Sequence, residues 1–124
     1  MPLEQATISP MDRGFLFGDG VYEVMAQIDG KIRAKSLHRG RLEASLLAIG
    51  LSAPVDDVFE QVDRLTHKAR LKFAKIYVQI TRGVGVTRDH AFPKHVTPTI
   101  FLTISDFSPQ LLPPAKAIVR PDIR

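Results

Sequence analysis

Two basic residues at positions 88 and 90 form the most distinctive polar pair in the chain. Residues two apart on an extended segment point to the same side, so Arg88 and His90 can both reach one anion. Arginine offers a planar fork of donors that fits a carboxylate or a phosphate, and histidine adds a donor whose charge responds to pH near neutrality. The pair therefore predicts an anion site. The competing interpretation is a solvated loop that carries an incidental histidine.

Three further residues have types and positions that suit binding. Tyr22 directly follows the turn Gly18-Asp19-Gly20, where its hydroxyl can project from the end of a strand, although most strand tyrosines are simply packed. His38 and Arg41 lie three apart near the start of an expected helix, where free amides and the helix dipole favour a phosphate. A solvated basic face is the competing interpretation for these two.

Several other kinds of site are excluded by the sequence. The chain has no cysteine, so it has no disulfide, thiolate zinc site, cysteine nucleophile or iron–sulfur cluster. His67 and His95 lack neighbours at metal-ligand spacing, and we expect them to be surface residues and no metal to bind. The sequence contains no Ser–His–Asp arrangement, Walker loop, dinucleotide fingerprint or HExxH motif. The glycine-rich segment 14–20 predicts a tight turn rather than a phosphate cradle.

The composition is typical of one globular domain. A chain of 124 residues, 44% hydrophobic and 24% charged, can bury a core without disulfides or metal. The net charge of +4 comes from basic residues interspersed with carboxylates, so we expect no nucleic-acid partner. No apolar run approaches the roughly 20 residues of a membrane span, and the chain does not open with a signal-peptide pattern. We therefore expect a cytoplasmic protein with no membrane partner.

The elements that must position these residues begin with a hairpin. Residues 3–8 are typical of a short strand, and residues 21–28 of a buried strand. Asp29-Gly30 is a strong two-residue turn signal and predicts a partner strand over residues 31–34.

Two helices are expected next. Ser36 is a good N-cap for a helix to about Ile49, and Gly50 follows as the residue just past its end. A second helix begins near Asp56. Its apolar face is formed at three- and four-residue spacing by Val58, Val62, Leu65 and Ala69.

The second half of the sequence predicts strands and connectors. Residues 74–82 alternate as a strand whose inner face carries Ile76, Val78 and Ile80. A long loop then spans residues 83–97, followed by an apolar run at 100–104 that suits a central strand. A proline-rich connector over 108–114 leads to a last strand over 115–120. The order predicts an α+β fold with a largely antiparallel sheet and two helices packed on it.

Three segments together resemble the fold-type-IV pyridoxal-phosphate enzymes. They are DRGFLFGDGVYEV at 12–24, His38-x-x-Arg41-Leu42, and Thr81-Arg82-Gly83 followed by RDHAFP at 88–93. The resemblance covers essentially the whole chain in order and is greatest to the D-amino acid aminotransferases. It implies pyridoxal 5'-phosphate as cofactor and amino acids and 2-oxo acids as substrates. The implied reaction converts a D-alanine-type donor and 2-oxoglutarate into pyruvate and D-glutamate.

The resemblance also implies roles for individual residues. Arg41 matches the arginine that holds the cofactor phosphate. Tyr22 matches a tyrosine that binds the substrate α-carboxylate together with Arg88 and His90 of the neighbouring subunit. A carboxylate site shared in this way implies a homodimer, and it gives the long loop a function.

One departure from the family limits what this chain can do alone. In the family, the lysine that binds the cofactor lies beyond the position matched by Arg124, and no lysine of this chain occupies its place. We therefore expect no catalytic residue in this chain. We expect residues 1–124 to be the single small N-terminal domain of such an enzyme, without the lysine-bearing C-terminal domain and inactive by itself.

Alternatives remain open at this level. Aminodeoxychorismate lyases and branched-chain aminotransferases share the fold but usually lack the Arg-x-His pair. A stand-alone remnant that kept the fold and lost catalysis is the alternative outside enzymes.

Overall fold

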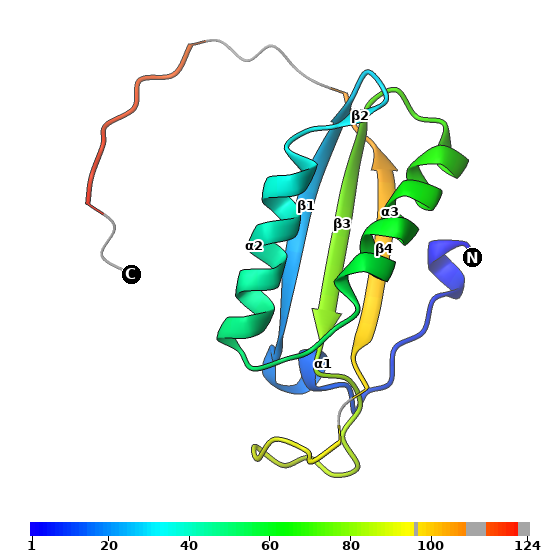
Figure 1. Cartoon of the computed structure of the whole chain (residues 1–124), viewed down its shortest axis with the longest axis vertical. Coiled ribbons are helices and arrows are strands. Elements are labelled where there is room, and N and C mark those ends of the chain that lie inside the picture. The colour runs from blue at the N-terminus through cyan, green and yellow to red at the C-terminus, as the bar shows by residue number, and fades with distance from the viewer. Residues whose placement is uncertain (96, 109–113, 122–124) are drawn as a thin grey trace.

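Four antiparallel strands form one sheet in the order β2-β1-β3-β4 in the computed structural model, which describes residues 1–95, 97–108 and 114–121. The strands are β1 (Gly20–Ile28), β2 (Lys31–Ile32), β3 (Ala74–Thr81) and β4 (Thr99–Asp106). Two helices, α2 (Lys35–Ala48) and α3 (Val55–Ala69), cover one face of this sheet (Figure 1). The predicted α+β fold class is confirmed.

The core lies between the helices and the central strand β3. Alternation along β3 turns Ala74, Ile76, Val78 and Ile80 toward the helices, and all four are fully buried. Ile76, Val78 and Ile80 belong to one cluster with residues from the other elements: Met25, Leu42, Leu46, Leu51, Val58, Phe59 and Val62. The predicted inner face of this strand is confirmed.

The two predicted helices are confirmed, with one correction at a helix start. The N-cap of α2 is Ala34, whose φ of 48° is left-handed, so Ser36 lies inside the first turn and does not cap the helix. Gly50 follows the C-cap Ile49 with a φ of 59°, as its predicted place just past the helix end requires. In the described part of the chain, no helix is long and apolar enough to cross a membrane.

The hairpin between β1 and β2 is confirmed, but its second strand is shorter than predicted. Asp29 and Gly30 form the turn, and only Gln27 and Ile28 pair with β2. The strand predicted over residues 31–34 ends at Ile32, because the chain turns into α2 at Ala34. The outer edge of β1 therefore has no strand partner over most of its described length.

Three other strand predictions were wrong. Residues 3–8 contain a short 3-10 helix, η1 (Leu3–Gln5), and exposed side chains instead of a paired strand. The apolar run at 100–104 lies in β4, which is an edge strand of the described sheet and not a central one. Residues 115–120 pair with no strand and extend away from the sheet with exposed side chains (Figure 1). Most of the predicted connector, 109–113, lies outside the described residues.

The predicted loop over 83–97 is closed at its base by backbone contacts. Gly83 has a φ of 85°, and a Cβ there would lie 2.0 Å from the Thr97 carbonyl oxygen. The amide of Arg13 donates to the Gly83 carbonyl at 2.8 Å, and an isolated bridge joins Asp12 to Val84. The short helix α1 (Arg13–Phe17) is thereby held against the loop.

Two glycine-to-alanine substitutions should have opposite effects on the free energy of unfolding, because only one of the two glycines lies at the base of this loop. Gly83→Ala should lower the free energy of unfolding by about 2 kcal/mol or more, because the left-handed backbone and the Thr97 carbonyl both oppose a Cβ. Gly40→Ala is the control, because Gly40 lies in α2 with open space around it. It should raise that free energy by roughly 0.5–1 kcal/mol. Urea unfolding of both variants measures the two effects, and equal effects would contradict the prediction.

Candidate functional site

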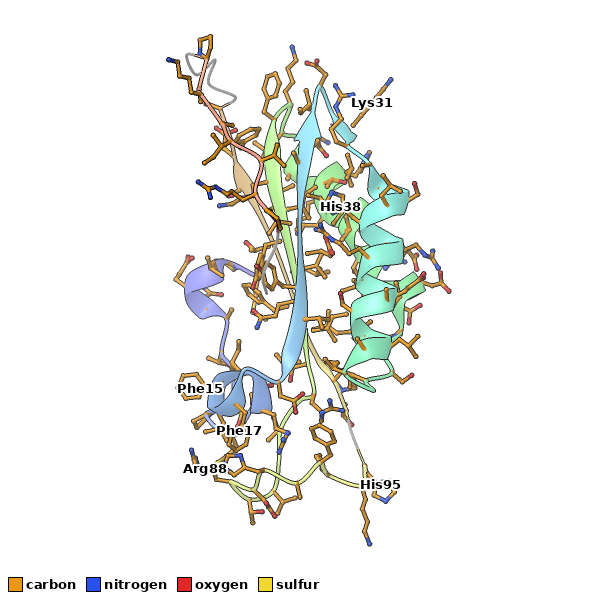
Figure 2. The ribbon with its side chains drawn as sticks, turned by 90° about the vertical axis from the view of Figure 1, so that its left-hand side faces the viewer. Phe15, Phe17, Lys31, His38, Arg88 and His95 are labelled. Carbon is orange, nitrogen blue, oxygen red and sulfur yellow. The ribbon has the colours of Figure 1, made fainter. Side chains whose placement is uncertain are left out.

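A buried carboxylate on β1 holds two basic side chains of α2. Alternation along β1 places Glu23 on the helix-facing side with Met25, and Glu23 is only 2% exposed. Arg41 donates to it through Nε and Nη2, both at 2.6 Å, and Nδ1 of His38 lies 2.7 Å from Oε2. His38 lies between α2 and the sheet (Figure 2). The two residues predicted to share one helix face, His38 and Arg41, therefore share one partner, Glu23.

The hydrogen bonds of this cluster stabilise its charges. The bonds from Arg41 lower the pKa of Glu23 below its ordinary value, burial opposes this, and the bond from His38 adds to it. The same carboxylate raises the pKa of Arg41, with a smaller contribution from the phenol of Tyr22.

Arg41 keeps one end of its guanidinium available. Its side chain is 65% exposed, and only Nε and Nη2 donate to Glu23, so Nη1 has no acceptor among the described residues. A fixed cation with a free N–H edge is suited to a phosphate oxygen. The residue fits the phosphate-binding role that the resemblance implies, which stays a prediction.

Arg88 and His90 lie together against one aromatic ring. The guanidinium carbon of Arg88 is 5.3 Å from the centroid of the Phe17 ring, and the ring of His90 is 4.8 Å from the same centroid. Both side chains are exposed, and Figure 2 shows Arg88 and Phe17 at the loop end of the molecule. The two basic groups are thus exposed and share one neighbour, and their role as an anion site stays a prediction.

Tyr22 does not join this pair within one chain. It is 64% exposed on the sheet face opposite the helices, and its ring stacks on Tyr77 with centroids 5.8 Å apart. In the described part of the chain, no hydrogen bond or ring contact links Tyr22 to Arg88 or His90. Its role in carboxylate binding stays a prediction.

A second carboxylate, Asp19, which the sequence reasoning missed, is half-buried and pairs with two buried arginines. Oδ2 of Asp19 lies 2.8 Å from Nε of both Arg13 and Arg82, and each arginine is 4% exposed. The other end of Arg82 donates to the Ile49 carbonyl at 2.7 Å and to the Gly50 carbonyl at 3.3 Å. Arg82 therefore joins the end of β3 to the end of α2.

The charge of Asp19 is stabilised against its burial. Burial alone would raise the pKa of Asp19, but hydrogen bonds from Arg82 and Arg13 outweigh it and lower that pKa. A carboxylate so paired stays ionised at neutral pH. The place of Asp19 in the turn before β1 is a sequence signal that could have singled it out. Its partner Arg82 could not be identified in this way, because it lies 63 residues away.

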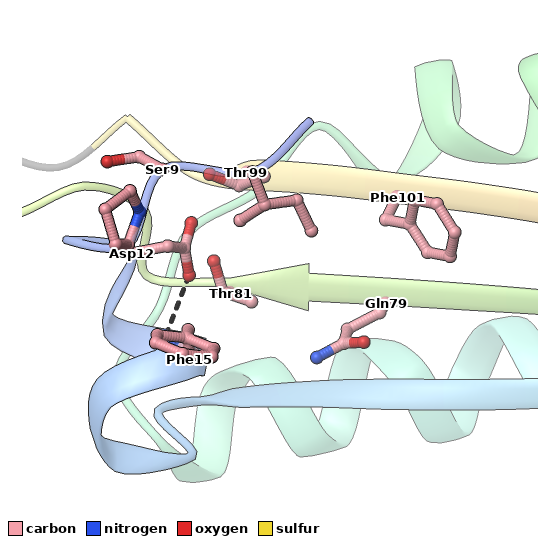
Figure 3. Close-up of a pocket in the computed structure, with 10 residues that line it drawn as sticks. Ser9, Asp12, Phe15, Gln79, Thr81, Thr99 and Phe101 are labelled. Atoms are coloured by element: carbon pink, nitrogen blue, oxygen red, sulfur yellow. Dashed lines mark hydrogen bonds between the residues drawn. The ribbon is translucent and has the colours of Figure 1, made fainter. Parts of the chain in front are cut away.

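A cavity of about 400 Å³ lies on the side of the sheet away from the helices, beneath α1 (Figure 3). Asp12 lies in its wall, where Oδ1 accepts from the Gly14 amide at 2.8 Å and Oδ2 is buried without a partner. Phe15 and Phe101 supply apolar surface. No cationic side chain lines the cavity among the described residues, so its chemistry does not suit a phosphate or a carboxylate.

His67 and His95 are exposed, as predicted. Within the described ranges, no group of three histidine, aspartate or glutamate side chains is arranged to hold a metal ion.

Solved structures similar to this chain include a lyase and an aminotransferase. The chain is similar to a 4-amino-4-deoxychorismate lyase from Pseudomonas aeruginosa, with a TM-score of 0.73, 26% identity and coverage of 82% of this chain and 36% of that one. A branched-chain amino acid aminotransferase from Escherichia coli has a TM-score of 0.76 at 19% identity, over 86% of this chain and 37% of that one, and supports the fold alone.

The model of the family described as amino-transferase class IV matches residues 20–124, so the chain belongs to that family. A D-alanine aminotransferase from Listeria monocytogenes is 38% identical over 92 residues, which are 73% of this chain and 32% of the relative. One from Staphylococcus epidermidis is 36% identical over 107 residues, which are 85% and 36%. The chain thus spans about a third of these relatives, and the family resemblance predicted from the sequence is confirmed.

The buried carboxylate beneath Arg41 predicts a pH-dependent effect of its removal. Glu23→Gln should lower the free energy of unfolding by about 1–2 kcal/mol at pH 7, because the charge that Arg41 and His38 face is lost. The lowered pKa of Glu23 means that its contribution is present above pH 4.5 and is lost as the pH falls through the folded-state value.

Urea unfolding between pH 3 and pH 7 tests this effect. The difference between the wild type and the variant should shrink below pH 4.5, and a difference independent of pH would contradict the role of the charge. Glu43→Gln is the control, because Glu43 pairs with Arg39 on the exposed side of the same helix and its loss should matter little.

Proposed function

We propose that residues 1–124 form the small N-terminal domain of a pyridoxal-phosphate aminotransferase that acts on D-amino acids. The reaction exchanges the amino group between a donor such as D-alanine and 2-oxoglutarate, giving pyruvate and D-glutamate. The observation that carries the proposal is the placement of Arg88 and His90 on the Phe17 ring, in a chain whose relatives include D-alanine aminotransferases. Two donors beside one aromatic ring suit a single carboxylate.

Arg41 takes the cofactor phosphate in this proposal. Its free Nη1 edge and its exposure suit a phosphate oxygen, and Glu23 keeps the guanidinium from rotating. When bound, pyridoxal phosphate supplies an electron sink for proton transfer at the substrate α-carbon. The residues of this chain hold and orient the two anionic ends of the reacting molecules, and the proton-transferring lysine belongs to the rest of the enzyme.

We further propose that the carboxylate site is completed by a second copy of the protein, which makes the enzyme a homodimer. Tyr22 of one subunit would meet Arg88 and His90 of the other. The separation of Tyr22 from this pair within one chain supports a shared site. A cytoplasmic location stays a prediction from the sequence.

An aminodeoxychorismate lyase is the second candidate, supported by the similarity to the Pseudomonas aeruginosa structure. A lyase releases pyruvate from aminodeoxychorismate without any amino-group acceptor. An aminotransferase forms pyruvate from D-alanine only when a 2-oxo acid is present. Pyruvate assays with each substrate, with and without 2-oxoglutarate, separate the two activities, and no turnover by the loaded enzyme would favour a non-catalytic remnant.

The carboxylate role predicts a specific kinetic effect of Arg88→Ala. The KM for D-alanine should rise about 10- to 100-fold, because a charge-assisted hydrogen bond to the substrate is lost. Lys94→Ala removes an exposed cation from the same loop and serves as the control, with the KM expected to stay near that of the wild type. An unchanged KM in Arg88→Ala would reject the carboxylate assignment.

The cofactor role predicts weaker binding of pyridoxal phosphate to Arg41→Ala. Loss of one charge-assisted contact to phosphate should raise the dissociation constant about 10-fold or more. Arg39→Ala on the same helix is the control, because Arg39 pairs with Glu43 and Asp56 away from the site. Absorbance titration of the apoenzyme with the cofactor measures both, and equal affinities in the two variants would refute the role of Arg41.

A further inference from the structure

The loop that carries Arg88 and His90 is held by hydrogen bonds from one buried side chain, Arg13. The guanidinium of Arg13 donates to three successive backbone carbonyls: Nη1 to Asp89 at 2.7 Å and to Ala91 at 3.2 Å, and Nη2 to His90 at 3.2 Å. These bonds cross more than 70 residues of sequence. Contacts within the loop itself are short-range, such as the Asp89 amide on the Thr87 carbonyl at 3.0 Å.

Arg13 is itself fixed from two other directions. Its Nε donates to Asp19 at 2.8 Å, and its backbone amide donates to the Gly83 carbonyl at 2.8 Å. With 4% exposure, Arg13 is not accessible as a ligand for a dissolved anion. The planar fork of an arginine spreads its donors over three nitrogens and can pair one carboxylate and three carbonyls at once, whereas the three donors of a lysine all leave from one nitrogen.

The Phe17 ring lies close to Arg13 and to both members of the Arg88 and His90 pair. The guanidinium carbon of Arg13 is 4.9 Å from the ring centroid, close to the 5.3 Å of Arg88 and the 4.8 Å ring separation of His90. Phe17 follows Arg13 by four residues in α1, so one helical turn presents both side chains to the loop. The backbone of the loop and the support beneath its two basic side chains thus come from the same short helix.

We propose that Arg13 is the positioning residue of the substrate carboxylate site. It sets the places of Arg88 and His90 by holding the carbonyls at 89–91, and it does not touch the substrate itself. This inference rests on the proposed function, since it assigns Arg13 to the carboxylate half of that site. A displacement of about 1 Å in a binding group can cost up to 100-fold in rate or affinity, so the anchor determines how well the pair binds.

Arg82 provides a matched control within the same cluster. It has the same 4% exposure as Arg13 and also pairs with Asp19. Its Nη atoms, however, donate to carbonyls at the end of α2 and not to the loop backbone. Arg82 also lies 4.0 Å from the Phe92 ring, a contact that a lysine cation can retain. Loss of the Arg82 guanidinium should therefore lower folding stability without displacing Arg88 and His90.

The experiment compares Arg13→Lys and Arg82→Lys in the holoenzyme. Arg13→Lys should raise the KM for D-alanine about 10-fold with kcat changed less than about 3-fold and cofactor affinity unchanged. Hydrogen exchange of the amides at 88–92 should become faster in the same variant. Arg82→Lys should leave both the KM and this exchange near the wild-type values.

Exchange at 88–92 does not depend on the identity of the substrate and separates the two proposals. A wild-type enzyme that does not turn over D-alanine overturns the proposed function, while unchanged exchange in Arg13→Lys overturns the anchor. Faster exchange with an unchanged KM in an active enzyme also overturns the positioning role. If Arg13→Lys does not fold, Asp19→Asn is the second variant. It weakens the fixation of Arg13 and should raise exchange and KM about 3-fold.

Discussion

The ionic cluster around Asp19 is the constraint on which the arrangement of this domain depends. Two buried arginines share this one carboxylate, and a charge removed from water is tolerated only when it is paired and hydrogen-bonded. The remaining donors of Arg13 and Arg82 are satisfied by carbonyls of the loop and of the end of α2. Asp19 therefore fixes the relative positions of three segments that are far apart in the sequence.

Glu23 has a corresponding role for the exposed arginine of α2. It fixes two nitrogens of Arg41 and leaves the third without an acceptor among the described residues. By contrast, every guanidinium nitrogen of the two arginines beside Asp19 donates to that carboxylate or to a carbonyl. The difference separates structural arginines from those that can bind a ligand. By the same criterion Arg88 resembles a residue that can bind a ligand, because it is exposed and its guanidinium lies against an aromatic ring.

The local parts of the fold could be predicted from the sequence, and the long-range parts could not. Alternation at Ile76 and Val78 and the turn at Asp29-Gly30 identified strands and a hairpin because these signals act over a few residues. The strand order does not appear in such patterns, which is why the apolar run in β4 was expected at the centre of the sheet. The partners of Asp19 and Glu23 were missed for the same reason, since the sheet and α2 bring them together from 63 and 18 residues away.

The two halves of the proposed site differ in how completely one chain can build them. The phosphate side is formed by Glu23 and Arg41, which one strand and one helix hold in place. The carboxylate side has Arg88 and His90 on a loop at the end of the molecule, while Tyr22 stacks on Tyr77 on an open sheet face. A loop that meets a second surface must keep its shape before that surface arrives, because ordering it on binding would cost conformational entropy. Buried anchoring of an exposed loop by Arg13 is thus consistent with the proposed site shared between two subunits.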